Sequence, residues 1–165
     1  MNNIVLIGMP GVGKSSAGVV LAKVLGYEFV DSDLVIQREE KRLLKDIIAE
    51  DGNDAFIEIE NRINAKLSVD NSVIATGGSV IYGKEAMEHL KEIGTVVYLR
   101  AGLDTIKSRL TNLLGRGVAM KKGQSLESLY KERTPLYEHY SDVIIDMDGA
   151  TIEETVKKIA KILKK

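Results

Sequence analysis

The sequence feature that most constrains the fold is the stretch GMPGVGKS at residues 8–15. It follows a short apolar run, Asn3 to Ile7, that we interpret as a buried strand, and it precedes a segment of helical periodicity, Lys14 to Leu25. Glycines at these positions permit a loop whose backbone N–H groups point inward, and the helix N-terminus adds its positive dipole end. A strand, this loop and a helix in succession predict a polyphosphate-binding P-loop.

The residues of this loop have distinct expected roles. Lys14 is expected to contact the β- and γ-phosphate oxygens of ATP, Ser15 to place its hydroxyl on Mg²⁺, and Ser16 to lie near the α-phosphate. Backbone N–H groups would cradle the phosphates, so the predicted ATP-binding residues here are Gly11, Val12, Gly13, Lys14, Ser15 and Ser16. A glycine-rich turn with a chance lysine is the alternative, and the placement and spacing together disfavour it.

Short Val- and Ile-rich segments alternate with longer segments of helical period along the whole chain, which indicates parallel strands joined by crossover helices. We therefore expect an α/β fold of the P-loop NTPase type, a three-layer α/β/α sandwich with a five-stranded parallel sheet. The expected strands are 3–7, 27–31, 72–76, 95–99 and 142–145. The expected helices are 14–25, 34–50 with a break, 54–68, 84–92, 104–114, 126–140 with an interruption near Pro135, and a last one that Thr151 caps.

Composition limits the classes of partner. The chain has 165 residues, 23 Lys plus Arg against 24 Asp plus Glu, and no cysteine. We expect a single domain over residues 1–165 that acts as a monomer in the cytoplasm. Its expected partner is a small molecule that accepts a phosphoryl group from ATP, and no nucleic acid or membrane is expected as a partner. Within it, residues 114–125 are glycine-rich and basic and are expected to form a mobile lid, and helices between residues 33 and 68 to bind the acceptor.

Asp31-Ser32-Asp33 follows the second expected strand at its carboxyl end, where open α/β sheets bind ligands. One carboxylate could hold Mg²⁺ through water, which we assign to Asp31. The other, Asp33, could accept the proton of an acceptor hydroxyl as that hydroxyl attacks the γ-phosphorus. A turn with an N-cap is the alternative for this pattern.

The P-loop followed by Asp31-Ser32-Asp33 resembles the opening of shikimate kinases. The resemblance continues through Asp51-Gly52, Phe56 with Glu60, the strand and turn at residues 74–78, and the stretch 132–137, ERTPLY. It implies an enzyme that uses ATP and Mg²⁺ to phosphorylate shikimate. It also implies roles for site residues: Lys14, Asp33 and Arg116 in catalysis, Arg109 and Arg116 at the nucleotide, and Asp33, Gly77, Gly78 and Arg133 at the acceptor, where Arg133 binds the carboxylate.

The chain departs from the family pattern at three places. Ile57 stands where these kinases carry a second carboxylate-binding Arg, Ser79 replaces the last glycine of a Gly-Gly-Gly turn, and residues 146–149, DMDG, stand where an Arg is expected. Arg62, on the same helix as Ile57, could reach the site from another turn. Two alternatives therefore remain. The chain could be a P-loop kinase for a different small hydroxylated metabolite, or a non-catalytic nucleotide-binding module. A guanine-specific Asn-Lys-x-Asp motif is absent.

Overall fold

The computed structural model of the chain describes residues 2–110 and 123–164. Its centre is a five-stranded sheet in the order β2-β3-β1-β4-β5, and all neighbouring strands are parallel. The strands are β1 Asn3–Ile7, β2 Glu28–Asp31, β3 Ser72–Ala75, β4 Gly94–Arg100 and β5 Val143–Asp146. The predicted five-stranded parallel sheet is confirmed.

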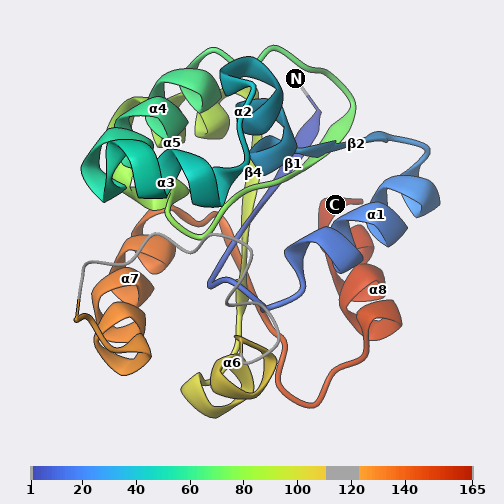
Figure 1. Cartoon of the computed structure of the whole chain (residues 1–165). Coiled ribbons are helices and arrows are strands. Elements are labelled where there is room, and N and C mark those ends of the chain that lie inside the picture. The colour runs from blue at the N-terminus through green and yellow to red at the C-terminus, as the bar shows by residue number, and fades with distance from the viewer. Residues whose placement is uncertain (1, 111–122, 165) are drawn as a thin grey trace.

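Helices cover both sides of this sheet, and Figure 1 shows α1 and α8 together on one side, with α5 and α7 on the other. The helices are α1 Lys14–Leu25, α2 Ser32–Glu40, α3 Leu44–Asp51, α4 Asn53–Ala65, α5 Lys84–Ile93, α6 Leu103–Leu110, α7 Leu126–Tyr140 and α8 Ile152–Leu163, with a short 3₁₀ helix, η1, at Val80–Tyr82. This is the predicted three-layer sandwich. Within the described part of the chain, no helix is long and apolar enough to cross a membrane.

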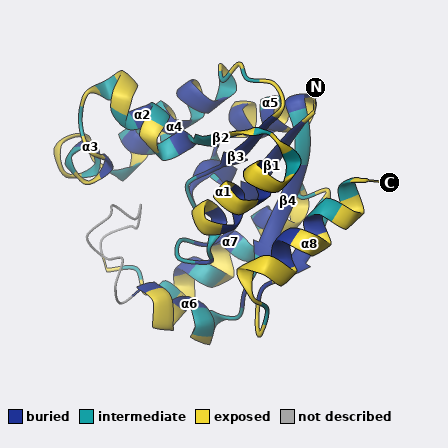
Figure 2. Cartoon of the chain, turned by 90° about the vertical axis from the view of Figure 1, so that its right-hand side faces the viewer, coloured by how far each residue is buried: buried dark blue, intermediate teal, exposed yellow. Residues whose placement is uncertain are grey.

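Two hydrophobic cores hold the elements together. The large one surrounds the sheet and includes all of β1 except Asn3, which agrees with the buried centre of the molecule in Figure 2. The small one lies among α2, α3 and α4 and consists of Ile36, Leu44, Ile47, Phe56 and Ile63. These three helices follow β2 in the chain, have a core of their own and form a helical cap, which Figure 1 shows as one group beside α5.

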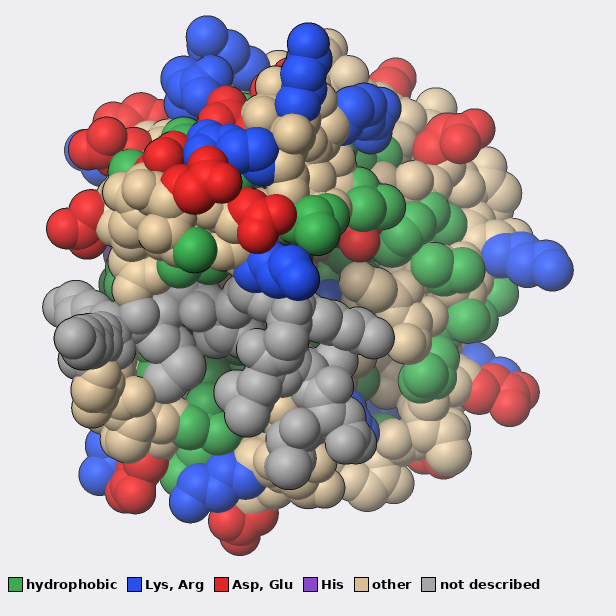
Figure 3. Space-filling view, in the orientation of Figure 1, with side chains coloured by type: hydrophobic (Ala, Val, Ile, Leu, Met, Phe, Trp, Pro, Cys, Tyr) green, Lys and Arg blue, Asp and Glu red, His purple; other side chains and the backbone are tan. Residues whose placement is uncertain are grey.

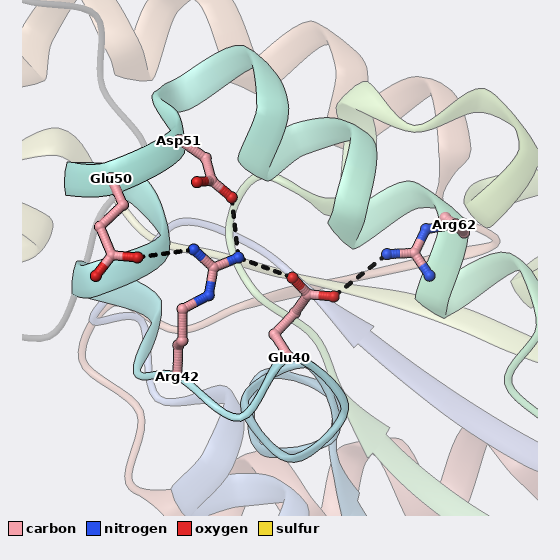
Figure 4. A network of polar contacts seen from close by, with 5 residues as sticks. All are labelled: Glu40, Arg42, Glu50, Asp51 and Arg62. Atoms are coloured by element: carbon pink, nitrogen blue, oxygen red, sulfur yellow. Dashed lines mark hydrogen bonds and ion pairs between the residues drawn. The ribbon is translucent and has the colours of Figure 1, made fainter.

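Arg42, in the break between α2 and α3, fixes the geometry of this helical cap (Figure 4). Its guanidinium contacts Glu40 at 2.9 Å, Glu50 at 3.0 Å and Asp51 at 2.9 Å, so that it joins the end of α2 to the end of α3. Glu40 also pairs with Arg62 of α4 at 3.4 Å. The network therefore ties all three helices together at the surface, where Figure 3 shows positive and negative side chains interspersed.

The interruption expected near Pro135 is wrong, because α7 runs from Leu126 to Tyr140 with Pro135 inside it. Proline removes one backbone hydrogen bond, but the helix remains anchored by its buried face, formed by Leu129, Arg133 and Tyr137. By contrast, the predicted cap of α8 is confirmed, since the Thr151 hydroxyl accepts a hydrogen bond of 3.1 Å from the Glu154 amide.

Candidate active site

A cavity of about 550 Å³ opens at the carboxyl ends of β1, β2 and β3. The predicted residues among those that line it are Gly11, Val12, Gly13, Lys14, Ser15, Ser16, Asp33, Gly77, Gly78, Arg109 and Arg133. Further lining residues include Pro10, Leu44, Phe56, Glu60, Thr76, Ser79, Met147, Ala150 and Ile152. The cavity thus joins the phosphate-binding loop to the predicted acceptor residues in one continuous space.

The P-loop has the backbone conformation that its glycines permit. Gly11 and Gly13 have φ angles of 82° and 108°, a region that side-chain-bearing residues rarely adopt. Gly13 is also the N-cap residue of α1, so the N–H groups of the first helical turn face the cavity without a side-chain cap to occupy them. This is the arrangement in which a helix N-terminus binds phosphate.

Lys14 begins α1 and has its ammonium group deep in this loop. Its Nζ donates hydrogen bonds to the carbonyl oxygens of Gly8 at 2.7 Å and Met9 at 3.0 Å. Burial lowers the pKa of Lys14 to about 8, and the nearby Asp33 carboxylate opposes that shift. An ammonium group at this position, with backbone carbonyl oxygens around it and a pKa close to neutral pH, is suited to bind phosphate oxygens.

Asp31 and Asp33 occupy different positions at the end of β2. Asp31 Oδ1 accepts hydrogen bonds from the amides of Asp33 at 2.9 Å and Leu34 at 3.3 Å, so this carboxylate caps α2. Asp33 lines the cavity, whereas Asp31 is not among the lining residues. Burial, reinforced by the charge of Asp31, raises the pKa of Asp33 to about 6, while Lys14 lowers it. Asp33 can therefore be ionised at neutral pH and still accept a proton.

Arg133 lies on the inner face of α7 and is only 1% exposed. Its guanidinium carbon is 5.4 Å from the centroid of the Tyr82 ring, and its Nε lies 3.4 Å from the Tyr82 hydroxyl. Gly78 is required beside it, since a Cβ at that residue would be 3.0 Å from Arg133 Nη1 and 2.7 Å from Pro10 Cδ. The turn after β3 therefore brings backbone against a planar cation that can bind a carboxylate.

Glu60 of α4 is a site residue for which the sequence interpretation assigned no role. Its Oε1 accepts a hydrogen bond of 2.6 Å from the hydroxyl of Ser79, and the side chain lines the cavity although the residue is 1% exposed. Burial raises the pKa of Glu60 to about 8. The sequence signal was its spacing: Phe56, Glu60, Ile63 and Asn64 recur at helical period and share the buried face of α4.

The opposite end of the cavity carries Arg109 of α6. Its Nη1 donates a hydrogen bond of 2.7 Å to the carbonyl oxygen of Val12, which fixes α6 against the P-loop. The turn at residues 146–149 closes the same end, because Asp148 accepts hydrogen bonds from the Gly102 amide at 2.9 Å and the Thr105 hydroxyl at 2.7 Å. Arg116 and residues 114–122 of the expected lid lie outside the described residues.

The structure does not bring Ile57 or Arg62 to the cavity. Ile57 packs against the small core of the helical cap. Arg62 reaches outward to Glu40, with 53% of its side chain exposed. Neither residue is among those that line the cavity, so Arg62 does not replace the guanidinium that Ile57 lacks.

Residues 10–164 match the shikimate kinase family. The chain belongs to the shikimate kinase family. A shikimate kinase of Thermodesulfovibrio yellowstonii is 38% identical over 164 residues, which cover 98% of this chain and 94% of the relative. A shikimate kinase of Clostridium botulinum strain Loch Maree is also 38% identical, over 100% of this chain and 98% of the relative.

Solved shikimate kinases have the same fold. The enzyme of Acinetobacter baumannii in complex with shikimate is 31% identical, with a TM-score of 0.91 over 99% of this chain and 93% of that one. The enzyme of Aquifex aeolicus is 28% identical, with a TM-score of 0.77 over 98% of this chain and 96% of that one. As a member of the shikimate kinase family, the chain is an ATP-dependent phosphotransferase that acts on an alcohol group, and these relatives give no support to the alternative of a non-catalytic module.

The buried Glu60 predicts that the stability of this chain depends on pH. In the folded chain the Glu60 carboxyl group has a pKa of about 8, whereas an ordinary glutamate, as in the unfolded chain, has a pKa of 4.5. Between these values the folded state binds more protons, so the free energy of unfolding should fall as pH rises, by up to about 1.4 kcal/mol per pH unit. Urea unfolding at a series of pH values measures this slope.

Glu60→Gln should flatten this slope, because the amide has no proton to lose. Glu58→Gln is the matched control, since Glu58 is exposed on the same helix. An unchanged slope in Glu60→Gln would show that Glu60 is already ionised in the folded protein.

Proposed function

We propose that the chain transfers the γ-phosphoryl group of ATP to the 3-hydroxyl of shikimate. The observation that carries this proposal is that one cavity holds Lys14 of the P-loop, the Asp33 carboxyl group and the buried Arg133 guanidinium. A phosphate-binding cation, a base and a carboxylate-binding cation are the groups that this transfer requires. The family supports the choice of acceptor.

The chemical step follows from the properties of these groups. Asp33 accepts the hydroxyl proton while the hydroxyl oxygen forms a bond to the γ-phosphorus, and the bond to the β-γ bridging oxygen breaks to release ADP. Lys14 stabilises the negative charge on the transferred group and on the leaving oxygen. Arg116 is proposed to add a second cation there.

The oxygen donors near the P-loop are suited to bind Mg²⁺. Ser15 supplies a hydroxyl that lines the cavity. Asp31 does not line the cavity, but its second carboxylate oxygen, beyond the one that caps α2, would hold Mg²⁺ through water. Among the described residues no group of three or more His, Cys, Asp or Glu side chains could hold a metal ion by itself. Mg²⁺ would therefore bind together with ATP oxygens, and it would supply charge neutralisation at the phosphates.

The nucleotide base is proposed to lie between Arg109 and the loop after β5. Arg109 is fixed by the Val12 carbonyl, and Met147, Ala150 and Ile152 provide an apolar wall at the same end of the cavity. A guanidinium plane and an apolar wall together suit a flat heterocycle.

We further propose that the chain works as a single-domain, monomeric, cytoplasmic enzyme. The near balance of 23 basic and 24 acidic residues and the absence of cysteine support this assignment.

An acceptor panel tests the proposed function. Purified protein with ATP and Mg²⁺ is offered shikimate, quinate, gluconate, homoserine and nucleoside monophosphates, and ADP release is followed. We expect shikimate to give the highest kcat/KM. A higher value for another hydroxylated metabolite would support the alternative that Ile57 raises, and the absence of acceptor-dependent ADP release would contradict the kinase assignment.

Arg133→Lys should raise the KM for shikimate by about ten- to a hundredfold and leave the KM for ATP within about threefold, because lysine cannot make the planar bidentate contact with a carboxylate. Steady-state kinetics with each substrate varied in turn measures both constants. Lys131→Ala, at an exposed residue of the same helix, is the control. Equal increases in both KM values would place Arg133 outside the acceptor site.

A further inference from the structure

The orientation of the Arg133 guanidinium depends on residues outside the cavity. Among the described residues, the cations that line the cavity are Lys14 in the P-loop, Arg109 on α6 and Arg133 on α7, beside the turn after β3. A guanidinium binds a carboxylate best through two parallel N–H groups, so its plane has to face the carboxylate. The side chains that hold this plane therefore bear on acceptor binding.

Tyr82 contacts the Arg133 guanidinium at two points. The guanidinium carbon lies over the Tyr82 ring, 5.4 Å from its centroid, which is within the range of a cation–π interaction. In addition, Arg133 Nε donates a hydrogen bond of 3.4 Å to the Tyr82 hydroxyl. Tyr82 is not among the residues that line the cavity, whereas Arg133 is. Tyr82 can therefore influence the acceptor through Arg133.

Glu132 fixes the direction of the Tyr82 hydroxyl. This hydroxyl donates a hydrogen bond to the carboxylate of Glu132, the exposed residue that precedes Arg133 on α7. Burial and the hydrogen bond to Glu132 raise the pKa of Tyr82, so the hydroxyl keeps its proton at neutral pH. With that proton directed at Glu132, the hydroxyl oxygen accepts from Arg133.

The backbone that carries Tyr82 is held in place on both sides. Tyr82 ends η1, where its amide donates to the Ser79 carbonyl at 3.1 Å and the Gly83 amide donates to the Val80 carbonyl at 3.0 Å. A Cβ at Gly83 would collide with the side chain of Asn61 on α4, so the end of η1 packs directly against that helix. A tyrosine on a segment fixed in this way is suited to hold another side chain in one orientation.

We propose that Tyr82 is a positioning residue, which holds the Arg133 guanidinium in the orientation that binds the acceptor carboxylate. The inference rests on the proposed function, because it assumes that Arg133 binds that carboxylate. An arginine side chain loses rotamer freedom when it binds a ligand, and a preformed orientation lowers this cost. Loss of Tyr82 should therefore weaken acceptor binding and leave ATP binding unchanged.

The first test separates the ring of Tyr82 from its hydroxyl. Tyr82→Leu, which removes both, should raise the KM for shikimate by about five- to thirtyfold, while kcat and the KM for ATP stay within about threefold of the wild type. Tyr82→Phe keeps the ring, so the KM for shikimate should rise by only about two- to fivefold. Steady-state kinetics with each substrate varied in turn measures these constants.

The second test asks whether Tyr82 acts through the charge of Arg133. The methyl ester of shikimate lacks the negative charge that Arg133 binds, so Tyr82→Leu should lower kcat/KM for the ester by less than about threefold. In Arg133→Met no guanidinium is left to position, and adding Tyr82→Leu should change kcat/KM for shikimate by less than about twofold further. General damage to the site would instead affect the acid and the ester equally.

Tyr27→Leu is the matched control, because Tyr27 also packs, partly buried, against the large core but precedes β2, away from the carboxyl ends of the strands. Thermal unfolding shows whether each variant is folded, and Tyr82→Met provides the same comparison if Leu prevents folding. An unchanged KM for shikimate in the folded variant, or equal losses with acid and ester, would overturn the inference and leave the proposed function intact. Absence of wild-type turnover with shikimate would contradict the proposed function itself.

Discussion

Replacing Lys14 with alanine should lower the rate of phosphoryl transfer by about 10²- to 10³-fold, which is the typical effect of removing one hydrogen-bond donor that stabilises negative charge in a transition state. The Lys14 ammonium lies inside the loop and lines the cavity together with Asp33. Its Nζ is held by the carbonyl oxygens of Gly8 and Met9, which fix the charge beside the cavity. Single-turnover measurements with saturating ATP and shikimate report the rate.

The fold should survive this change. Lys14 is buried at a cost, as its lowered pKa shows, and alanine is a good helix former at the start of α1. Circular dichroism and thermal unfolding measure this, with Lys23→Ala as a control, since Lys23 is exposed on the same helix. A folded Lys14→Ala protein that turns over at nearly the wild-type rate would remove Lys14 from the mechanism.

Asp33→Asn should lower the transfer rate by about 10²- to 10⁴-fold, the usual contribution of a general base. The amide has the shape of the carboxyl group but cannot accept the hydroxyl proton. ATP binding should stay within about threefold of the wild type, because Asp33 contributes to the acceptor part of the cavity. Rates from product formation and nucleotide affinities from equilibrium titration give the two quantities separately.

Asp31→Asn is the matched control for Asp33→Asn, since both variants remove one negative charge at the end of β2. If Asp31 binds hydrated Mg²⁺, the Asp31 variant should need more Mg²⁺ and recover at high Mg²⁺ concentration, whereas excess Mg²⁺ should not restore Asp33→Asn. Transfer by Asp33→Asn within about threefold of the wild type would contradict its role as base.

Strong local patterns made the sheet and the nucleotide end of the site predictable. Buried parallel strands are continuous runs of Val and Ile, and the P-loop spacing fixes both the turn and the helix that follows it. Ligands of open α/β sheets bind at the carboxyl ends of the strands, and this expectation predicted that Asp33, just after β2, lies at the cavity. These features depend on residues that are close in sequence, which is why they could be derived without the structure.

The remaining parts depend on contacts between distant segments. Pro135 signals a break by itself, yet the burial of Arg133 and Tyr137 keeps α7 continuous. Glu60 looks like one of several acids on a polar helix until Ser79, nineteen residues away, is seen to bind it at 2.6 Å. Similarly, the turn at residues 146–149 gave no sign that Asp148 would bind Gly102 and Thr105.

The position of the transferred phosphate tests the proposed function most directly. Wild-type protein is incubated with ATP, Mg²⁺ and shikimate, and the product is examined by phosphorus and proton nuclear magnetic resonance. We expect one new phosphate ester, whose phosphorus couples to the proton on carbon 3 of the shikimate ring, formed in equal amount to ADP. Release of ADP without such an ester, or an ester on another oxygen, would contradict the proposed reaction.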